Sequence, residues 1–294
     1  MLILQVIVDY FEGLYSRPDL PDISISEEGF NKISKEQIRD LDNILGREEV
    51  RKAVWACVPL KALGYNGYHM GFIRKMWGVI GENFTDSVLE FFLTSRMPKG
   101  VNTTLLTLIP KVEKPEETNQ FRSISLVGCI YKVIAKILAH RLKQVVGSLV
   151  SDSQSAFIEG RSIMDGVLVA NEVVQWVKKK RGATGLLVKL DFQKAYDSIR
   201  WDFVDKIMSI MGFGSIWRSW IKEYISTASI SVLINGSPTM PFKMRRGLRQ
   251  GDPIFPFLFV LAVEAFNQLI RRGMNKGLIR GLEVGKDNCE VTHL

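Results

Sequence analysis

The residue whose type and position best suit it to chemistry is Asp191, in the stretch LLVKLDFQKAYDSIRWDFV over residues 186–204. From Leu186 to Phe192 the residues alternate between two faces, which predicts a strand that stops at Asp191. After Ser198 apolar residues recur every four positions, which predicts a helix. A carboxylate at such a junction can hold a metal or act in catalysis. On this stretch alone, an Asp that simply meets water is the favoured interpretation, because loops are polar in general.

The composition is that of a globular, basic chain. Its 294 residues, 46% hydrophobic and 24% charged, are enough for one large domain or two smaller ones. The net charge of +8 favours a polyanionic partner, nucleic acid first, although many basic proteins bind none. The three cysteines match no zinc or disulfide pattern and suit a reducing compartment.

No membrane span is expected, because the longest apolar run, residues 255–266, is too short and contains Glu264. The opening MLILQVIV lacks the basic segment and the cleavage site of a signal peptide. We therefore interpret it as the first helix or strand of a core.

The elements that must position Asp191 are predicted to include both helices and strands. Helical patterns dominate residues 1–100, and β-type runs follow at 103–111 and 121–128. Helices are predicted over 130–149 and 163–177, the second running into the basic end KKKRG.

Three local signals complete the pattern beyond Asp191. Either Asp197 or Ser198 is expected to cap the helix that follows. Asn235-Gly236 predicts a hairpin turn after an alternating run. A last apolar helix is expected to stop at Gly273, after two arginines.

Five blocks carry a resemblance when taken in order: MPKGVNTT, LTLIPKVEKPEETNQFRSISLVGCIYKVIAKILAHRL, QSAFIEGRSI, LVKLDFQKAYDSIRWDF and GLRQGDPIFPFLF. Together they resemble the reverse transcriptase of LINE-type (non-LTR) retrotransposons, most like the plant elements. The resemblance implies an α+β, right-hand polymerase fold with fingers and a palm built on an antiparallel sheet. The expected division is a helical N-terminal extension over 1–100, fingers over 101–185 and an incomplete palm over 186–294.

The resemblance also implies a reaction: the 3′-hydroxyl of a DNA primer attacks the α-phosphate of a dNTP on an RNA template, helped by two Mg²⁺ ions. Asp191 matches the first metal-binding carboxylate, and Phe192 would offer its backbone near the triphosphate. Tyr196 matches the aromatic position whose ring would clash with a ribose 2′-hydroxyl, with core packing as the alternative. Asp197 is interpreted as a helix cap and not as a metal ligand.

Four further matches concern the nucleotide. Lys111 and Arg122 match the basic pair of the fingers that grips the triphosphate, Arg by its fork and Lys by its point charge. Gln250 and Gly251 match the loop that positions the nucleotide and the template base. Glycine there would permit close backbone approach.

The chain also departs from the family pattern. Ser123 stands where the family usually has Pro, Phe255 stands where it has a small residue, and PLKALGYNGYHM is a degraded block. The aromatic-Ala-Asp-Asp block that supplies further metal carboxylates is absent from the sequence, and CEVTHL resembles only its lead-in. We therefore expect little or no polymerase activity from this chain alone.

Two other interpretations remain open. A non-catalytic relic that still binds nucleic acid is one, and a reading frame that does not fold is the other. The family's work would place the protein on nuclear DNA, but the sequence shows no clear import signal.

Overall fold

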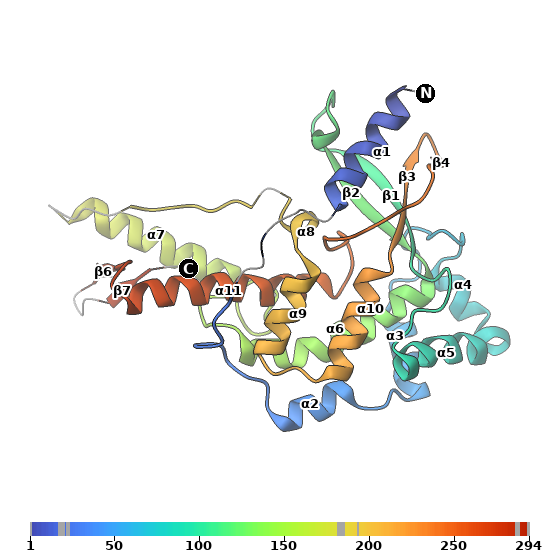
Figure 1. Cartoon of the computed structure of the whole chain (residues 1–294), viewed down its shortest axis with the longest axis horizontal. Helices are drawn as coiled ribbons and strands as arrows, with labels where there is room; N and C mark the ends of the chain where they lie inside the picture. Colours follow the sequence, from blue (N-terminus) through green and yellow to red (C-terminus); the bar gives the residue numbers. More distant parts are fainter. Residues whose placement is uncertain are drawn as a thin grey trace.

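The computed structural model describes residues 2–16, 21, 24–180, 186–192, 194–285 and 289–292. In Figure 1 a layer of helices supports a small sheet, and a long arm extends to the side opposite the N-terminal helices α3 to α5. The mixed α+β class expected from the sequence is confirmed. None of the helices within these ranges has the length and apolar character needed to cross a bilayer.

The first part of the chain is mainly helical, with one strand hairpin. The elements in order are α1 (Leu2–Tyr15), α2 (Lys35–Asp42), α3 (Arg47–Ala56), α4 (Met70–Lys75), α5 (Trp77–Thr94), β1 (Thr103–Pro110), η1 (Thr118–Gln120), β2 (Phe121–Val127), α6 (Cys129–Leu149) and α7 (Ile163–Lys179). The predicted strands and helices of residues 103–177 are thereby confirmed.

The second part alternates short helices with strands. Its elements are α8 (Ala195–Ser198), α9 (Trp201–Ile210), α10 (Ser215–Ser226), β3 (Ser229–Ile234), β4 (Ser237–Pro238), β5 (Phe242–Lys243), α11 (Phe255–Asn275), β6 (Leu282–Val284) and β7 (Cys289–Val291). Asn235 and Gly236 form the predicted turn between β3 and β4, with φ of 51° and 80°.

The central sheet has the order β2-β1-β3-β4, and β5 also pairs with β3. β1 runs antiparallel to β2, with Leu108 opposite Ser123, and parallel to β3, with Leu106 opposite Val232. β2 is therefore an edge strand of this sheet. Helix α1 lies across one sheet face, where Phe11 and Tyr15 pack with Leu106 and Ile230 (Figure 1).

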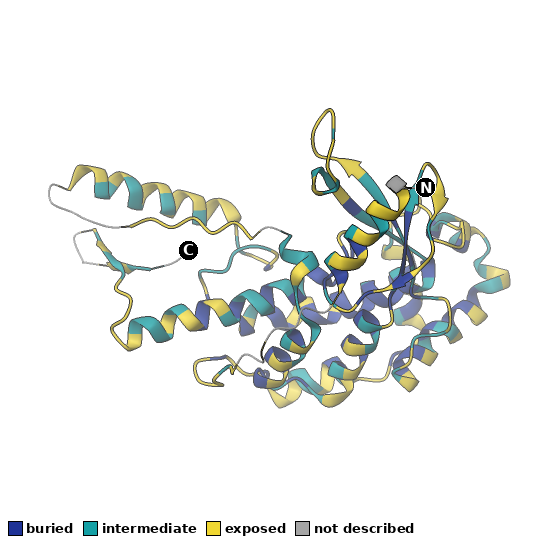
Figure 2. Ribbon diagram, turned by 45° about the horizontal axis from the view of Figure 1, so that its top comes forward, coloured by how far each residue is buried: buried dark blue, intermediate teal, exposed yellow. Residues whose placement is uncertain are grey.

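The main core lies between the helices. α6 contributes thirteen buried residues, and α10 contributes Trp217, Trp220 and Tyr224. Figure 2 shows these helices dark blue, whereas α7 carries no buried residue and projects into the arm. The arm therefore depends little on the core that supports the sheet.

Two predictions about element boundaries are wrong. Residues 186–192 form no strand within the described chain, and Leu186 and Val188 are 90% and 62% exposed. The alternating pattern is present, but a strand also needs a neighbour for its ladder of hydrogen bonds. The last helix continues past Gly273 to Asn275, because Gly273 packs closely against the Ile279 side chain and Gly277 takes the left-handed conformation instead.

Candidate active site

Asp191 and Phe192 line a cavity of about 910 Å³ between α9 and α11. Both are exposed, and the Phe192 ring meets the Phe266 ring edge to face at 6.2 Å. The cavity wall is mainly apolar, with Phe203 and Phe259 among its side chains. Asp191 therefore faces an open, apolar-walled space.

The described residues do not fit a two-magnesium centre. Among them, no group of three His, Cys, Asp or Glu side chains lies close enough to hold a metal ion. Asp202 also lines the cavity, but its Oδ2 pairs with the Arg200 guanidinium at 2.5 Å. One exposed carboxylate cannot balance two divalent ions, which prefer several oxygen ligands.

Tyr196 sits on the short helix α8 and is half-buried. Its ring stacks on Phe259 with centroids 4.8 Å apart, and burial raises the pKa of its phenol. Its carbonyl oxygen accepts a 2.7 Å hydrogen bond from the Leu248 amide. The segment bearing Tyr196 is thus joined to the loop that carries Gln250.

Asp197 is not the helix cap that the sequence predicts, and neither is Ser198. The cap position of α9 is Arg200, which makes no side-chain cap bond. Asp197 Oδ1 instead accepts a 3.0 Å hydrogen bond from the Tyr15 hydroxyl. Burial raises the pKa of the Asp197 carboxyl, and the hydrogen bond from Tyr15 offsets part of that rise.

Lys111 and Arg122 lie at the outer end of the β1–β2 hairpin, and both are exposed. Arg122 is opposite Ile109 in the ladder, and the Lys111 amide donates to Gln120 two positions further out. The two cations are therefore diagonal neighbours on one face, about 7–8 Å apart at their Cα atoms. Lys111 Nζ also donates to the Asn119 carbonyl at 3.0 Å.

The loop over residues 245–252 exposes Gln250 and Gly251 between two buried charges. Arg249 is 1% exposed, and its Nη1 donates to Asn102 Oδ1 and to Thr104 Oγ1 at 2.5 and 2.9 Å. Asp252 is 6% exposed, accepts from the Tyr224 hydroxyl at 2.5 Å and caps the Ile254 amide at 3.2 Å. Burial raises the pKa of Asp252, and the Arg249 charge opposes that shift.

The conformation of this loop needs glycine at its tip. Gly251 has φ of +97°, a region that side-chain-bearing residues rarely adopt. The Gln250 carbonyl accepts a 3.4 Å hydrogen bond from the Ser125 amide of β2. The loop therefore touches the strand that carries Arg122.

Two of the departures from the family pattern, Ser123 and Phe255, are buried side chains. Ser123 is 8% exposed, and its side chain lowers the pKa of the Tyr15 phenol against the rise that burial causes. Phe255 is 2% exposed and forms one wall of the aromatic cage around Arg249, 5.9 Å from the guanidinium. Neither side chain lies in the 910 Å³ cavity.

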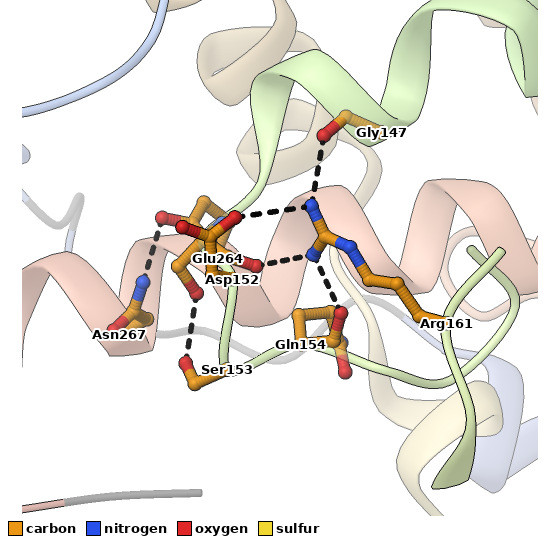
Figure 3. Close-up of polar contacts among 8 residues, drawn as sticks. Gly147, Asp152, Ser153, Gln154, Arg161, Glu264 and Asn267 are labelled. Atoms are coloured by element: carbon orange, nitrogen blue, oxygen red, sulfur yellow. Dashed lines mark hydrogen bonds and ion pairs between the residues drawn. The ribbon is translucent and has the colours of Figure 1, made fainter. Parts of the chain in front are cut away.

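The block QSAFIEGRSI, residues 154–163, contacts the C-terminal end of α6. Arg161 donates to the carbonyls of Gly147, Ser151 and Gln154, which close the C-terminal end of α6 (Figure 3). Glu264 of α11 accepts from the Ser151 amide at 3.1 Å and from Asn267 at 2.7 Å. Arg161 of the block thus binds the segment after α6, and Ser151 of that segment bonds to α11.

The structure unites some predicted site residues and separates others. The Gln250 carbonyl is hydrogen-bonded to β2, the Tyr196 carbonyl is hydrogen-bonded to Leu248 of the same loop, and Lys111 and Arg122 lie on the β1–β2 hairpin. Asp191 and Phe192 line the cavity on α9 and α11, which includes none of those five residues.

Sequence reasoning missed Arg249 and Asp252 as the anchors of the loop. Their spacing around Gln-Gly was the available signal, but their partners come from β1, α6 and α10. Such partners are distant in sequence, so no local pattern reveals them.

Comparisons with known proteins agree on one family. The protein-family model described as "Reverse transcriptase (RNA-dependent DNA polymerase)" matches residues 109–284. Over 272 residues the chain is 26% identical to "Transposon TX1 uncharacterized 149 kDa protein" of Xenopus laevis, covering 92% of this chain and 21% of that protein. Over 216 residues it is 26% identical to "Retrovirus-related Pol polyprotein from type-1 retrotransposable element R2" of Popillia japonica, covering 73% and 29%.

The chain spans less than a third of the length of these relatives. Among solved structures, a chain of "Partial Cas6-RT-Cas1--Cas2 complex" is 16% identical with a TM-score of 0.40, covering 79% of this chain and 35% of that one.

Proposed function

Since the chain belongs to the reverse transcriptase (RNA-dependent DNA polymerase) family, with non-LTR retrotransposon proteins among its relatives, we propose that it supplies the nucleotide-positioning part of an RNA-directed DNA polymerase. The hydrogen bond from Ser125 of β2 to the Gln250 carbonyl carries the proposal. It supports the proposal because it joins the cationic hairpin to the loop that a bound nucleotide would touch.

Each side chain has a role that its chemistry suits. Lys111 and Arg122 bind the triphosphate of the incoming dNTP through charge and through the guanidinium fork. Tyr196 excludes a ribose 2′-hydroxyl by the bulk of its ring. Gln250 and Gly251 contact the nucleotide and the template base, because glycine lets the backbone approach closely.

Asp191 contributes one carboxylate to the reaction. The family transfers nucleotides with Mg²⁺, and the described residues include no group that could hold such an ion. The RNA template, the DNA primer and the dNTP are the partners that the family's reaction requires.

Primer extension on an RNA template with Mg²⁺ and dNTPs tests this proposal. The chain is compared with the same chain continued by a family-type Ala-Asp-Asp hairpin. We expect extension only by the continued chain, and we expect Asp191→Asn to abolish it. Asp86→Asn, at an exposed carboxylate of α5 paired with Arg47, is the matched control and leaves extension intact. Extension by neither chain, or extension insensitive to Asp191→Asn, would overturn the proposal.

A second candidate function is non-catalytic nucleic-acid binding. It is favoured by the exposed lysines 178–180 at the end of α7. Such binding releases counterions, so affinity for an RNA–DNA hybrid should fall steeply as salt rises. Affinity that is flat across salt would exclude this function.

A further inference from the structure

Helix α1 lies outside the residues that the family model matches, yet it is part of the sheet's core. Phe11 and Tyr15 are each 2% exposed and pack against Leu106, Ile230 and Met244. Figure 1 shows α1 crossing the strands and ending beside α8. Its C-terminal end thus reaches the segment that carries Tyr196.

The Tyr15 hydroxyl joins two parts of the chain that are distant in sequence. It donates to Asp197 Oδ1 at 3.0 Å, and the Ser123 side chain of β2 opposes the rise that burial causes in the pKa of that hydroxyl. Burial raises the pKa of the Tyr15 phenol, so the hydroxyl keeps its proton and remains a donor. The Tyr15 side chain therefore joins the end of α1 to α8.

The last carbonyls of α1 hold the loop over residues 245–252. The Tyr15 carbonyl accepts from the Arg245 amide at 2.9 Å, and the Leu14 carbonyl accepts from Arg246 Nε at 2.8 Å. Terminal helix carbonyls have no partner within their own helix, so these bonds satisfy acceptors that would otherwise need water.

A second tyrosine of α1, Tyr10, contacts Lys194, the residue that precedes α8. The Lys194 ammonium lies 4.5 Å from the centre of the Tyr10 ring and hydrogen-bonds to the Tyr10 hydroxyl. Lys194 has φ of 54°, a left-handed conformation uncommon for a lysine. Contacts from α1 therefore hold α8 at its N-terminal cap and at Asp197.

The α8 segment and the loop over residues 245–252 pack closely against each other. A Cβ atom on Gly247 would lie 2.7 Å from the Asp197 carbonyl oxygen. The Gly247 amide donates to Ile199 at 2.8 Å, and the Leu248 amide donates to Tyr196 at 2.7 Å. A shift of Asp197 would consequently displace both Tyr196 and the loop that ends in Gln250.

We infer that Tyr15 is a positioning residue of the nucleotide site, which through Asp197 fixes the Tyr196 segment against the 245–252 loop. The inference rests on the proposed function, because it assigns Tyr196 to the sugar of the nucleotide. Its consequence is that discrimination between deoxy- and ribonucleotides depends on a helix outside the matched family region.

The first experiment is hydrogen–deuterium exchange on the whole chain and its Tyr15→Phe variant, which keeps the ring packing and removes only the hydroxyl. We expect exchange of the Gly247 and Leu248 amides to rise about fivefold, the equivalent of one hydrogen bond of about 1 kcal/mol. Amides of α6 should be unchanged. Tyr68→Phe, at a half-exposed ring stacked on Phe72, is the control and should change neither.

Unchanged exchange at Gly247 and Leu248 would overturn the inference. Equal acceleration in α6 would also overturn it, because Tyr15 would then serve only global stability. This experiment therefore distinguishes local positioning by Tyr15 from a role in global stability, and it needs no nucleotide.

The second experiment compares the affinities of the chain for dGTP and GTP. We expect Tyr15→Phe to lower the preference for dGTP at least threefold, while Tyr68→Phe leaves it unchanged. An unaltered preference in a variant that still binds dGTP would overturn the inference. If neither protein binds dGTP and the exchange at Gly247 still rises, the proposed function fails while the positioning by Tyr15 stands.

Discussion

The guanidinium carbon of Arg249 lies 4.2 Å from the ring centre of Tyr131, inside the helical core. The cage continues with Tyr224 and Phe255, at 5.8 and 5.9 Å. A buried cation is tolerated only when it is paired and hydrogen-bonded, and here Asp252 supplies the nearby opposite charge. The exposed Gln250 and Gly251 are therefore held by buried neighbours on either side.

Replacing Arg249 with Met should lower the free energy of unfolding by about 3–5 kcal/mol, because the buried Asp252 would lose its charge partner. Urea unfolding measures this change. The double variant Arg249→Met/Asp252→Asn should lose less than the sum of the single variants, since it removes both charges. Strict additivity would show that the two charges do not interact.

Replacing Ser123 with Pro, the family's usual residue, should change the free energy of unfolding by less than about 1 kcal/mol, because the Ser123 amide donates no hydrogen bond to β1. The Ser125 amide points away from β1, toward Gln250, and in an antiparallel ladder Ser123 points the same way. Proline therefore removes no ladder bond at this position of the edge strand.

Ile124→Pro is the matched control, because the Ile124 amide points toward Thr107 of β1. It should cost about 2–3 kcal/mol, since the ladder loses a donor and leaves a carbonyl unpaired. Thermal or urea unfolding of the two variants compares them directly. Equal losses would contradict the assigned direction of the Ser123 amide.

Replacing Gly251 with Ala should destabilise the fold by about 1–2 kcal/mol, because φ of +97° is strained for any residue with a Cβ. It should also weaken dNTP binding, since the neighbouring Gln250 would move. Gly78→Ala is the control: this glycine lies in α5 with nothing within 4 Å of an added Cβ, so alanine should stabilise the helix by about 0.5–1 kcal/mol. Destabilisation by both changes would argue against backbone strain at Gly251.

Replacing Asp197 with Asn should raise the stability at neutral pH relative to the parent chain. The folded pKa of Asp197 is raised by burial, so its contribution is fully present below the unfolded pKa of about 3.9 and is lost as pH rises through the folded pKa. Asn keeps an oxygen acceptor for Tyr15 without a charge. The stability difference between the two proteins should therefore shrink as pH falls toward 4.

Urea unfolding of both proteins between pH 4 and pH 8 measures this difference. A parent chain more stable than the variant at pH 8 would mean that Lys194, Lys111 and Arg246 outweigh the burial of the charge. The sign of the pH dependence thus tests the cause of the pKa shift.

Elements whose signals are local were predicted from the sequence. The Asn235-Gly236 turn requires two positive φ angles, which these residues accept easily. Helix α6 follows from one apolar stripe, and β1 and β2 follow from alternating runs joined by a polar loop. In each case the residues that decide the structure lie within about twenty positions of one another.

Elements that depend on partners distant in sequence were not predicted correctly. The alternation over residues 186–192 is a strand pattern, but a strand forms only beside another strand. Asp197 has the residue type of a helix cap. Its carboxylate oxygen instead accepts a hydrogen bond from Tyr15, which lies 182 positions earlier. The local preference of Asp for a helix cap is therefore overridden by a more buried hydrogen bond to a residue distant in sequence.

The sequence by itself determined the family, the α+β class and the residue types available for binding a nucleotide. The tertiary structure alone decided which of them meet: Tyr196 and Gln250 on one connected unit, and Asp191 in a separate apolar-walled cavity. It also decided that Tyr15 belongs to that unit. The reason is physical, because residue type sets what a side chain can bind, whereas burial and long-range packing set what it can reach.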